Sequence, residues 1–288
     1  MVVVFSLGAA CGYALASILQ QKAASEVPAE HSMRIGLLTR LIRRPLWLLG
    51  FATDFAGFGF EAAALSIGSL AVVQPLIVLG LPLAMLGVAV SSHRHLHPPE
   101  WGAIAAVTIG IAIFLAVSVP SRGRGHGPVN RWVLVGMLGG AALVAVLVAA
   151  EARPAWKTTL FAVGTGIVHG VSAALTKTVA SVVHHHPLNL LGHWETYALV
   201  VVGLGSMLLA QSAFQAGHLK ASLPAITLLP PVVGLAIGAY VFGERINASS
   251  VGWALDVVGA AMAVAGVFAL ARSHLAEVAY AHGEDVAL

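Results

Sequence analysis

The sequence has very little charge: only 9% of its 288 residues are Asp, Glu, Lys or Arg, against about 25% in soluble domains. So few charges cannot solvate the surface of a soluble protein of this length. Hydrophobic residues make up 58% of the chain, and the mean hydropathy of the chain is +0.89. The composition therefore predicts an integral membrane protein and excludes a water-soluble fold.

Other absences narrow the function. Cys11 is the one cysteine, so no disulfide can form within the chain. No Lys or Arg precedes Lys22, which argues against a cleaved signal peptide. The chain lacks an H-E-x-x-H helix, a G-x-S-x-G elbow and a phosphate-binding loop. We therefore predict neither an enzyme nor a cofactor, and we interpret the net charge of +3 as a topology signal rather than a sign of nucleic-acid binding.

Nine apolar segments are long enough to cross a bilayer, whose ~30 Å core needs about 20 helical residues. They fall near residues 2–22, 46–66, 69–90, 101–119, 131–150, 157–182, 194–216, 220–242 and 250–271. The loops on one side hold ten Lys or Arg residues and those on the other hold four, with Lys177 left out as part of a span. Because positive loops stay in the cytoplasm, we expect a plasma-membrane protein with its N-terminus outside and its C-terminus inside.

An internal repeat divides the chain. At an offset of 149 residues, Gly68, Leu70, Pro75, Pro82 and Gly110 correspond to Gly217, Leu219, Pro224, Pro231 and Gly259. This predicts an all-α fold of two four-helix repeats, 1–119 and 157–272, joined by a linker with one helix at 120–156 and followed by a tail at 273–288. Because an odd number of spans separates the two copies, the second is inverted, as in many transporters.

The four prolines of the repeat, Pro75, Pro82, Pro224 and Pro231, lie inside apolar spans. Proline removes a backbone hydrogen bond and kinks a helix, and a freed carbonyl in lipid needs a partner or a wet cavity. We therefore expect the third and eighth spans to bend around an interior cavity. Lys22 and Lys177 are at equivalent helix ends, so both are expected to snorkel to a surface.

The segment "PAITLLPPVVGLAIGAYVFGERI" at 224–246 resembles the penultimate helix and Gly-Glu turn of EamA-type members of the drug/metabolite transporter superfamily. In the first half, "RRPLWLLG" at 43–50 and "VVQPL" at 72–76 resemble the NIPA branch, described as magnesium transporters. The resemblance covers most of residues 1–272 and implies a transporter fold of the drug/metabolite type, with magnesium as one implied substrate.

Ionisable groups inside a membrane are costly and usually functional. Asp54 and Glu61 are seven residues apart and share a helical face, at depths of ~12 Å and ~22 Å from the inner end. The pair suggests a proton or cation site, with a structural carboxyl as the alternative. Because Asp54 is nearer the midplane, we expect Asp54→Asn to impair function more than Glu61→Gln.

The other candidates for a substrate or ion pathway are polar side chains within the predicted spans. They are Tyr13, Ser17 and Gln20 in the first span, Gln74 beside Pro75, His169 in the sixth, Gln211 and Gln215 in the seventh, and Asp256 in the ninth. Each could contact substrate or join helices by hydrogen bonds. The His-rich turns at 93–97 and 184–186 leave metal binding open.

From these features we expect a secondary transporter that moves a small solute by alternating access. The alternatives are a divalent-cation transporter and a flippase of a lipid-linked headgroup. The expected partners are a small-molecule or ion substrate and the lipid bilayer, with a homodimer left open.

Overall fold

The computed structural model describes residues 1–25, 44–91, 93–185, 187–215, 219–247 and 249–273. Within these ranges the regular secondary structure is helical except for one antiparallel pair of two-residue strands, β1 (Val119–Pro120) and β2 (Ile246–Asn247). The helices are α1 (Val2–Ser25), α3 (Pro45–Ile67), α4 (Leu70–Val78), α5 (Gly80–Ser91), α6 (Pro98–Val117), α7 (Val129–Ala152), α8 (Lys157–His185), α9 (Trp194–Gln215), α10 (Leu219–Val241) and α11 (Ser250–Ala271). Short 3-10 turns, η2 (Pro154–Trp156) and η3 (Pro187–Gly192), flank α8.

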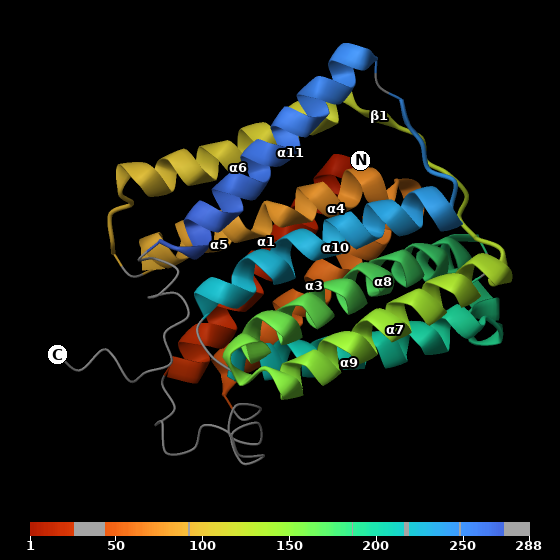
Figure 1. Ribbon diagram of the computed structural model, residues 1–288, viewed down its shortest axis with the longest axis horizontal. Coiled ribbons are helices and arrows are strands. Elements are labelled where there is room, and N and C mark those ends of the chain that lie inside the picture. The colour runs from red at the N-terminus through yellow and green to blue at the C-terminus, as the bar shows by residue number, and fades with distance from the viewer. Residues whose placement is uncertain (26–43, 92, 186, 216–218, 248, 274–288) are drawn as a thin grey trace.

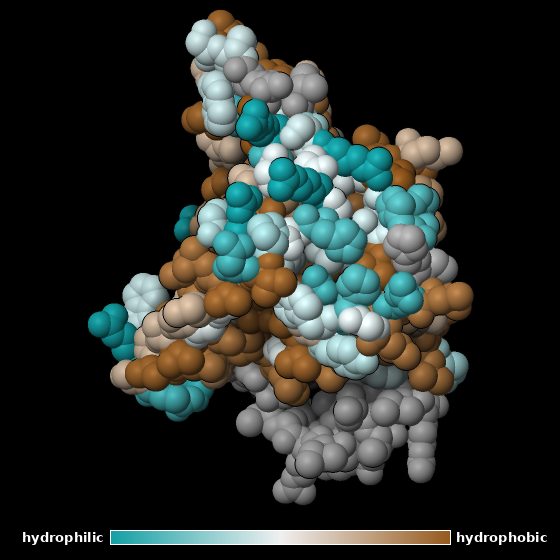
Figure 2. Space-filling view, turned by 90° about the vertical axis from the view of Figure 1, so that its right-hand side faces the viewer, coloured by the Kyte–Doolittle hydropathy of each residue, from teal (hydrophilic) through white to brown (hydrophobic). Residues whose placement is uncertain are grey.

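Eight spans of the described chain are long and apolar enough to cross a membrane, with α4 and α5 counted together as one. They match eight of the nine predicted segments, and the remaining segment, 194–216, coincides with α9. Large hydrophobic side chains such as Phe55, Met137 and Leu208 are exposed on the sides of the helices. Figure 2 shows one end of the molecule, where hydrophilic residues gather across the middle and hydrophobic surface flanks them. This distribution suits a protein embedded in a bilayer.

Local sequence explains where the helices begin. Pro45 occupies the first turn of α3, where a missing N–H costs nothing. The α6 helix starts with two prolines, and a capping box joins His97 and Glu100, whose side chain accepts the His97 N–H at 2.8 Å. Ser249 caps the start of the α11 helix, and its hydroxyl accepts the Gly252 N–H at 3.1 Å.

The helices lie along a common direction and pack in a few main pairs (Figure 1). The α1 helix packs on α3, α8 packs on both α9 and α10, and α7 packs on α8. The α4 helix contacts α10, so the two halves of the chain meet there. The α6 and α11 helices form a pair of their own along one side of the bundle.

The third predicted span is not one helix. It is divided into α4 and α5, which meet at Leu79. Pro82 explains the break, since it has no N–H to donate to the Val78 carbonyl four residues back and its ring crowds that carbonyl. Its counterpart, α10, continues as one helix through Pro224, Pro230 and Pro231. The third span is therefore interrupted at Leu79, whereas α10 remains one helix, and the bending of both spans around a cavity stays a prediction.

The α6 and α11 helices cross at two glycines. A Cβ on Gly259 would lie 2.6 Å from the Gly110 carbonyl oxygen, and a Cβ on Gly110 would clash with the Gly259 carbonyl oxygen. The two backbones can approach this closely only because neither residue has a side chain. Gly110 and Gly259 are also the residues that correspond in the sequence repeat.

We expect Gly110→Ala to destabilise the protein by about 1–3 kcal/mol, the usual cost of overpacking. Gly102→Ala is the matched control, because a Cβ at Gly102 of the same helix meets nothing within 4 Å. Alanine favours a helix interior over glycine, so the control should be neutral or stabilising. Thermal unfolding of the detergent-purified variants measures the difference, and equal midpoints would contradict the close crossing.

Candidate functional site

Glu61 is the centre of a buried polar cluster. Its side chain is only 5% exposed. The Tyr13 hydroxyl donates a hydrogen bond to Glu61 Oε2 at 2.5 Å, and Gln74 Nε2 donates to Oε1 at 3.0 Å. Both carboxylate oxygens are thus held by neutral donors, and no ion pair to Glu61 is found in the described part of the chain. Three helices, α1, α3 and α4, contribute to this cluster.

Small residues bring these three side chains together. A Cβ on Gly12 would lie 2.7 Å from the Gly57 Cα, so α1 and α3 touch backbone to backbone there. Tyr13, the residue after Gly12, therefore lies against Gly57. Glu61 is one helical turn after Gly57, so its carboxylate is within reach of the Tyr13 hydroxyl. Gln74 lies across α10 at Gly234, where a Cβ would come within 3.0 Å of Gln74 Cγ. The cluster is therefore positioned at the junction of the first and second halves of the chain.

Asp54 and His169 lie beside this cluster. Both side chains are exposed, and they belong to α3 and α8, which pack against each other. His169 Nδ1 is also 3.0 Å from the Ser206 hydroxyl of α9. Asp54 is three residues before Gly57 on α3, and a Cβ on Gly57 would lie 3.0 Å from the Tyr13 ring. Five sequence-predicted candidates, Tyr13, Asp54, Glu61, Gln74 and His169, are thus gathered in one region.

A second cluster surrounds Lys177. Its ammonium group is 3% exposed and forms an ion pair with Glu244, which is equally buried. It also donates to the Arg122 carbonyl at 2.9 Å and lies 4.9 Å from the centre of the Phe242 ring. The expectation that Lys177 snorkels to a surface is wrong, because a buried carboxylate already neutralises its charge.

Glu244 also caps helix α4. Its Oε1 accepts the Leu70 N–H at 2.9 Å, and its Oε2 accepts the Ala71 N–H at 3.2 Å. These are two of the first amides of the helix, which have no partner within it. A carboxylate at a helix N-terminus is also favoured by the helix dipole. Glu244 therefore ties the end of α10 to the start of α4.

The Gly-Glu turn explains how Glu244 reaches this position. Gly243 adopts a left-handed backbone with φ +67°, which a side chain would disfavour. The chain then folds back so that the Glu244 N–H donates to the Gly238 carbonyl at 3.0 Å, which closes the end of α10. Gly238 leaves room for the returning side chain, since a Cβ there would lie 2.7 Å from Glu244 Oε2.

Helix α4 connects the two clusters. Glu244 holds its first two amides, and Gln74 projects to Glu61 about one turn later. At 1.5 Å per residue, Leu70 and Gln74 are ~6 Å apart along the axis. Movement of α4 relative to α10 would therefore disturb both clusters at once.

The remaining candidates lie apart from the Glu61 cluster. Asp256 is buried and accepts a hydrogen bond from the Ser118 hydroxyl at 2.8 Å, between α11 and the end of α6. Gln20 packs at Gly50, and Ser17 is engaged in an interaction of its own on α1. Gln211 and Gln215 belong to α9, but their side chains lie outside the described residues.

The His-rich turns do not assemble a metal site in the described residues, where no group of three or more His, Cys, Asp or Glu side chains is placed to hold an ion. His93, His95 and His97 are all exposed along the α5–α6 connection. His184 and His185 stack edge to face at the end of α8.

Comparison with known proteins extends the sequence evidence. An uncharacterized protein of Corynebacterium glutamicum is 30% identical over 277 residues, which cover 95% of this chain and 94% of that protein. The chain belongs to the family of that protein. The aligned length includes both halves of the chain and the linker helix. No family model matches the sequence, and no solved structure matches it.

The Lys177–Glu244 pair is the feature that the site prediction missed. Glu244 was recognised only as part of a Gly-Glu turn, and Lys177 was assigned to a helix end. A signal was available, because a lysine inside an apolar span needs a buried anionic partner. The sequence has few acidic residues. Among them, Glu244 directly follows a glycine at the end of an apolar span.

Proposed function

We propose that this protein is a membrane transporter of the drug/metabolite type that moves a small solute by alternating access. The observation that carries the proposal is the Glu61 cluster. A carboxylate deep in the protein, held by Tyr13 and Gln74 without an ion-pair partner among the described residues, is costly in a membrane. Such a group is suited to receive a proton or a positively charged substrate group, because either would relieve its uncompensated charge.

The position of the cluster supports the same proposal. In transporters built from inverted repeats, substrate sites lie where the repeats meet. Gln74 packs on Gly234 of the second half, and the corresponding residues Gly110 and Gly259 cross each other. In the proposed inverted repeat, an approximate twofold axis through the α4–α10 and α6–α11 contacts would account for both observations. The chain's resemblance to the drug/metabolite superfamily points in the same direction.

The Lys177–Glu244 pair fits this scheme as a latch between the halves. It joins α8, the turn after α10 and the start of α4, at the end of the molecule that carries β1 and β2. Opening that end would require the ion pair or the α4 cap to separate. The α4 helix also presents Gln74 to Glu61. Binding of a solute at the Glu61 cluster and separation of the Lys177–Glu244 pair would therefore be coupled through this one helix.

Magnesium transport is less well supported than transport of an organic solute. A hard divalent cation takes six or more oxygen ligands, and both oxygens of Glu61 already accept hydrogen bonds.

For the orientation in the membrane, we propose that the N-terminus is outside and the C-terminus cytoplasmic. A reporter fused after Leu288 should respond as cytoplasmic, and an extracellular response would reverse the assignment.

A ligand screen followed by flux measurement tests the function. The purified protein is screened by thermal shift against organic amines, amino acids, sugars, nucleosides and magnesium chloride. Compounds that raise the unfolding midpoint are then followed in proteoliposomes, with protein-free liposomes as the control. We expect at least one organic compound to be carried at a saturable rate. Flux equal to that of protein-free liposomes for every stabilising compound would overturn the proposal, whereas flux of magnesium alone would favour the cation alternative.

A further inference from the structure

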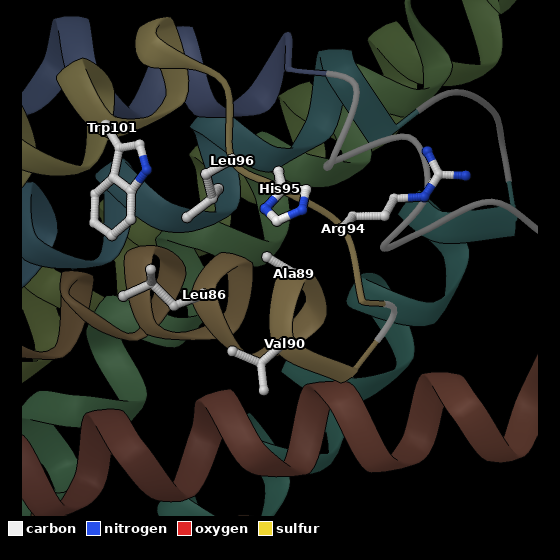
Figure 3. A pocket seen from close by; sticks show the side chains of 7 residues that line it. All are labelled: Leu86, Ala89, Val90, Arg94, His95, Leu96 and Trp101. Carbon is white, nitrogen blue, oxygen red and sulfur yellow. The ribbon is translucent and has the colours of Figure 1, made fainter.

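A hollow of about 310 Å³ lies where α5 ends and α6 begins, away from the two polar clusters. Its walls come from the last turns of α5, the connecting segment and the first turn of α6. The lining includes Leu86, Val90, Arg94, His95, Leu96 and Trp101. Figure 3 shows Leu86, Leu96 and Trp101 together on one side, His95 in the middle, and Arg94 extending away on the other side.

The hollow arises because α6 leaves the bundle. The α6 helix packs mainly on α11 rather than on α5, so the two consecutive helices diverge. Between them the chain reverses at His93, a non-glycine residue with φ 50°. The reversal is closed by the Arg94 N–H, which donates to the Ala89 carbonyl at 2.9 Å. Arg94 and His95 are thereby held at one end of the apolar walls.

The hollow is amphipathic and faces outward. Val90 is 76% exposed and Trp101 is 54% exposed. The Arg94 guanidinium forms no hydrogen bond or ion pair in the described part of the chain. The nearest acid of α6, Glu100, is buried and accepts the His97 N–H of its own cap. An apolar cleft that ends in a cation with no acidic partner among the described residues complements a ligand with an acyl chain and an anionic head.

The location of the hollow identifies the ligand class. It lies at a helix boundary between two membrane spans, where Trp residues concentrate at the lipid–water interface. Basic pockets between membrane helices bind anionic lipid headgroups. We propose that this hollow binds one anionic phospholipid, with its phosphate at Arg94 and His95 and an acyl chain along Leu86, Leu96 and Trp101.

Native mass spectrometry of the full chain in neutral detergent tests the proposal. The protein is titrated with dioleoyl-phosphatidylglycerol and, separately, with dioleoyl-phosphatidylcholine. The test variant is Arg94→Gln combined with His95→Gln, and the control is Arg153→Gln, an exposed arginine just after α7. We expect the test variant to bind phosphatidylglycerol about fivefold more weakly, as for the loss of one cationic contact to an anionic lipid.

The outcomes separate a specific site from general attraction. Unchanged phosphatidylcholine binding in the test variant, together with unchanged phosphatidylglycerol binding in Arg153→Gln, supports the site. Equal loss in the test and control variants would overturn it, because the effect would then be nonspecific charge. The proposal would also be overturned if millimolar inorganic phosphate displaced bound phosphatidylglycerol as effectively as added phosphatidylglycerol does. The ligand of the hollow would then be a free anion. Because Arg94 is exposed, the substitution should leave the unfolding midpoint unchanged.

Discussion

Glu244→Ala is expected to lower the free energy of unfolding by about 3–5 kcal/mol, the range found when one partner of a buried ion pair is removed. The change leaves the Lys177 ammonium group buried with the Arg122 carbonyl as its remaining hydrogen-bond partner. It also leaves the Leu70 and Ala71 amides at the start of α4 without their acceptor. Thermal or denaturant unfolding of the detergent-purified protein measures the loss.

Glu151→Ala is the matched control for this prediction. Glu151 also pairs with a lysine, Lys157, at 2.9 Å, but its side chain is 72% exposed. Surface ion pairs contribute about 0–1 kcal/mol, so the control should unfold almost as the wild type does. Equal stability losses in Glu244→Ala and Glu151→Ala would contradict a structural role for the buried pair.

The two partners of the buried pair should not be equivalent. Lys177→Met removes the cation, but Glu244 keeps two amide donors from α4. Glu244→Ala instead isolates a buried cation, which costs more. We therefore expect Lys177→Met to be the milder variant. A greater loss from Lys177→Met would indicate that the carboxylate depends on the lysine more than on the helix cap.

Glu61→Gln is expected to weaken binding of the transported solute by about tenfold to a hundredfold, which corresponds to ~1.5–3 kcal/mol for a hydrogen bond to a charged group. The fold should survive, because the new amide can accept from Tyr13 and donate to the Gln74 carbonyl oxygen after that side chain rotates. Affinity is measured with a compound that stabilises the wild type in the thermal-shift screen. An unchanged affinity with normal folding would assign Glu61 a purely structural role.

Asp54→Asn provides the comparison within the same helix. The depth estimate from the sequence makes Asp54 the more sensitive acid. The structure favours the opposite order, because Glu61 is buried and held by two donors whereas Asp54 is exposed. We therefore expect Asp54→Asn to reduce affinity less than Glu61→Gln, and a larger effect of Asp54→Asn would restore the ranking from the sequence.

The sequence by itself determined the membrane class and the helical segments. Length and hydropathy suffice for these features, because a bilayer requires about 20 apolar residues per span and satisfies no backbone polar groups. Spacing along the chain also identified most of the Glu61 cluster, since an acid or a glutamine inside an apolar span is conspicuous. The sequence singles out Tyr13 and Gln74 one by one as candidates. That Tyr13 contacts Glu61 depends on the close approach of α1 and α3 at Gly12 and Gly57.

Tertiary structure alone decided which charges are paired and which helices break. Lys177 and Glu244 are 67 residues apart in the chain, and no periodic pattern within one helix relates them. Their pairing follows from the left-handed turn at Gly243 and from the docking of α4 on α10. The same holds for the third span, where Pro82 divides α4 from α5 while α10 continues through three prolines. Whether a proline interrupts a helix depends on how neighbouring helices accommodate the freed carbonyl, and that is a property of the assembled bundle.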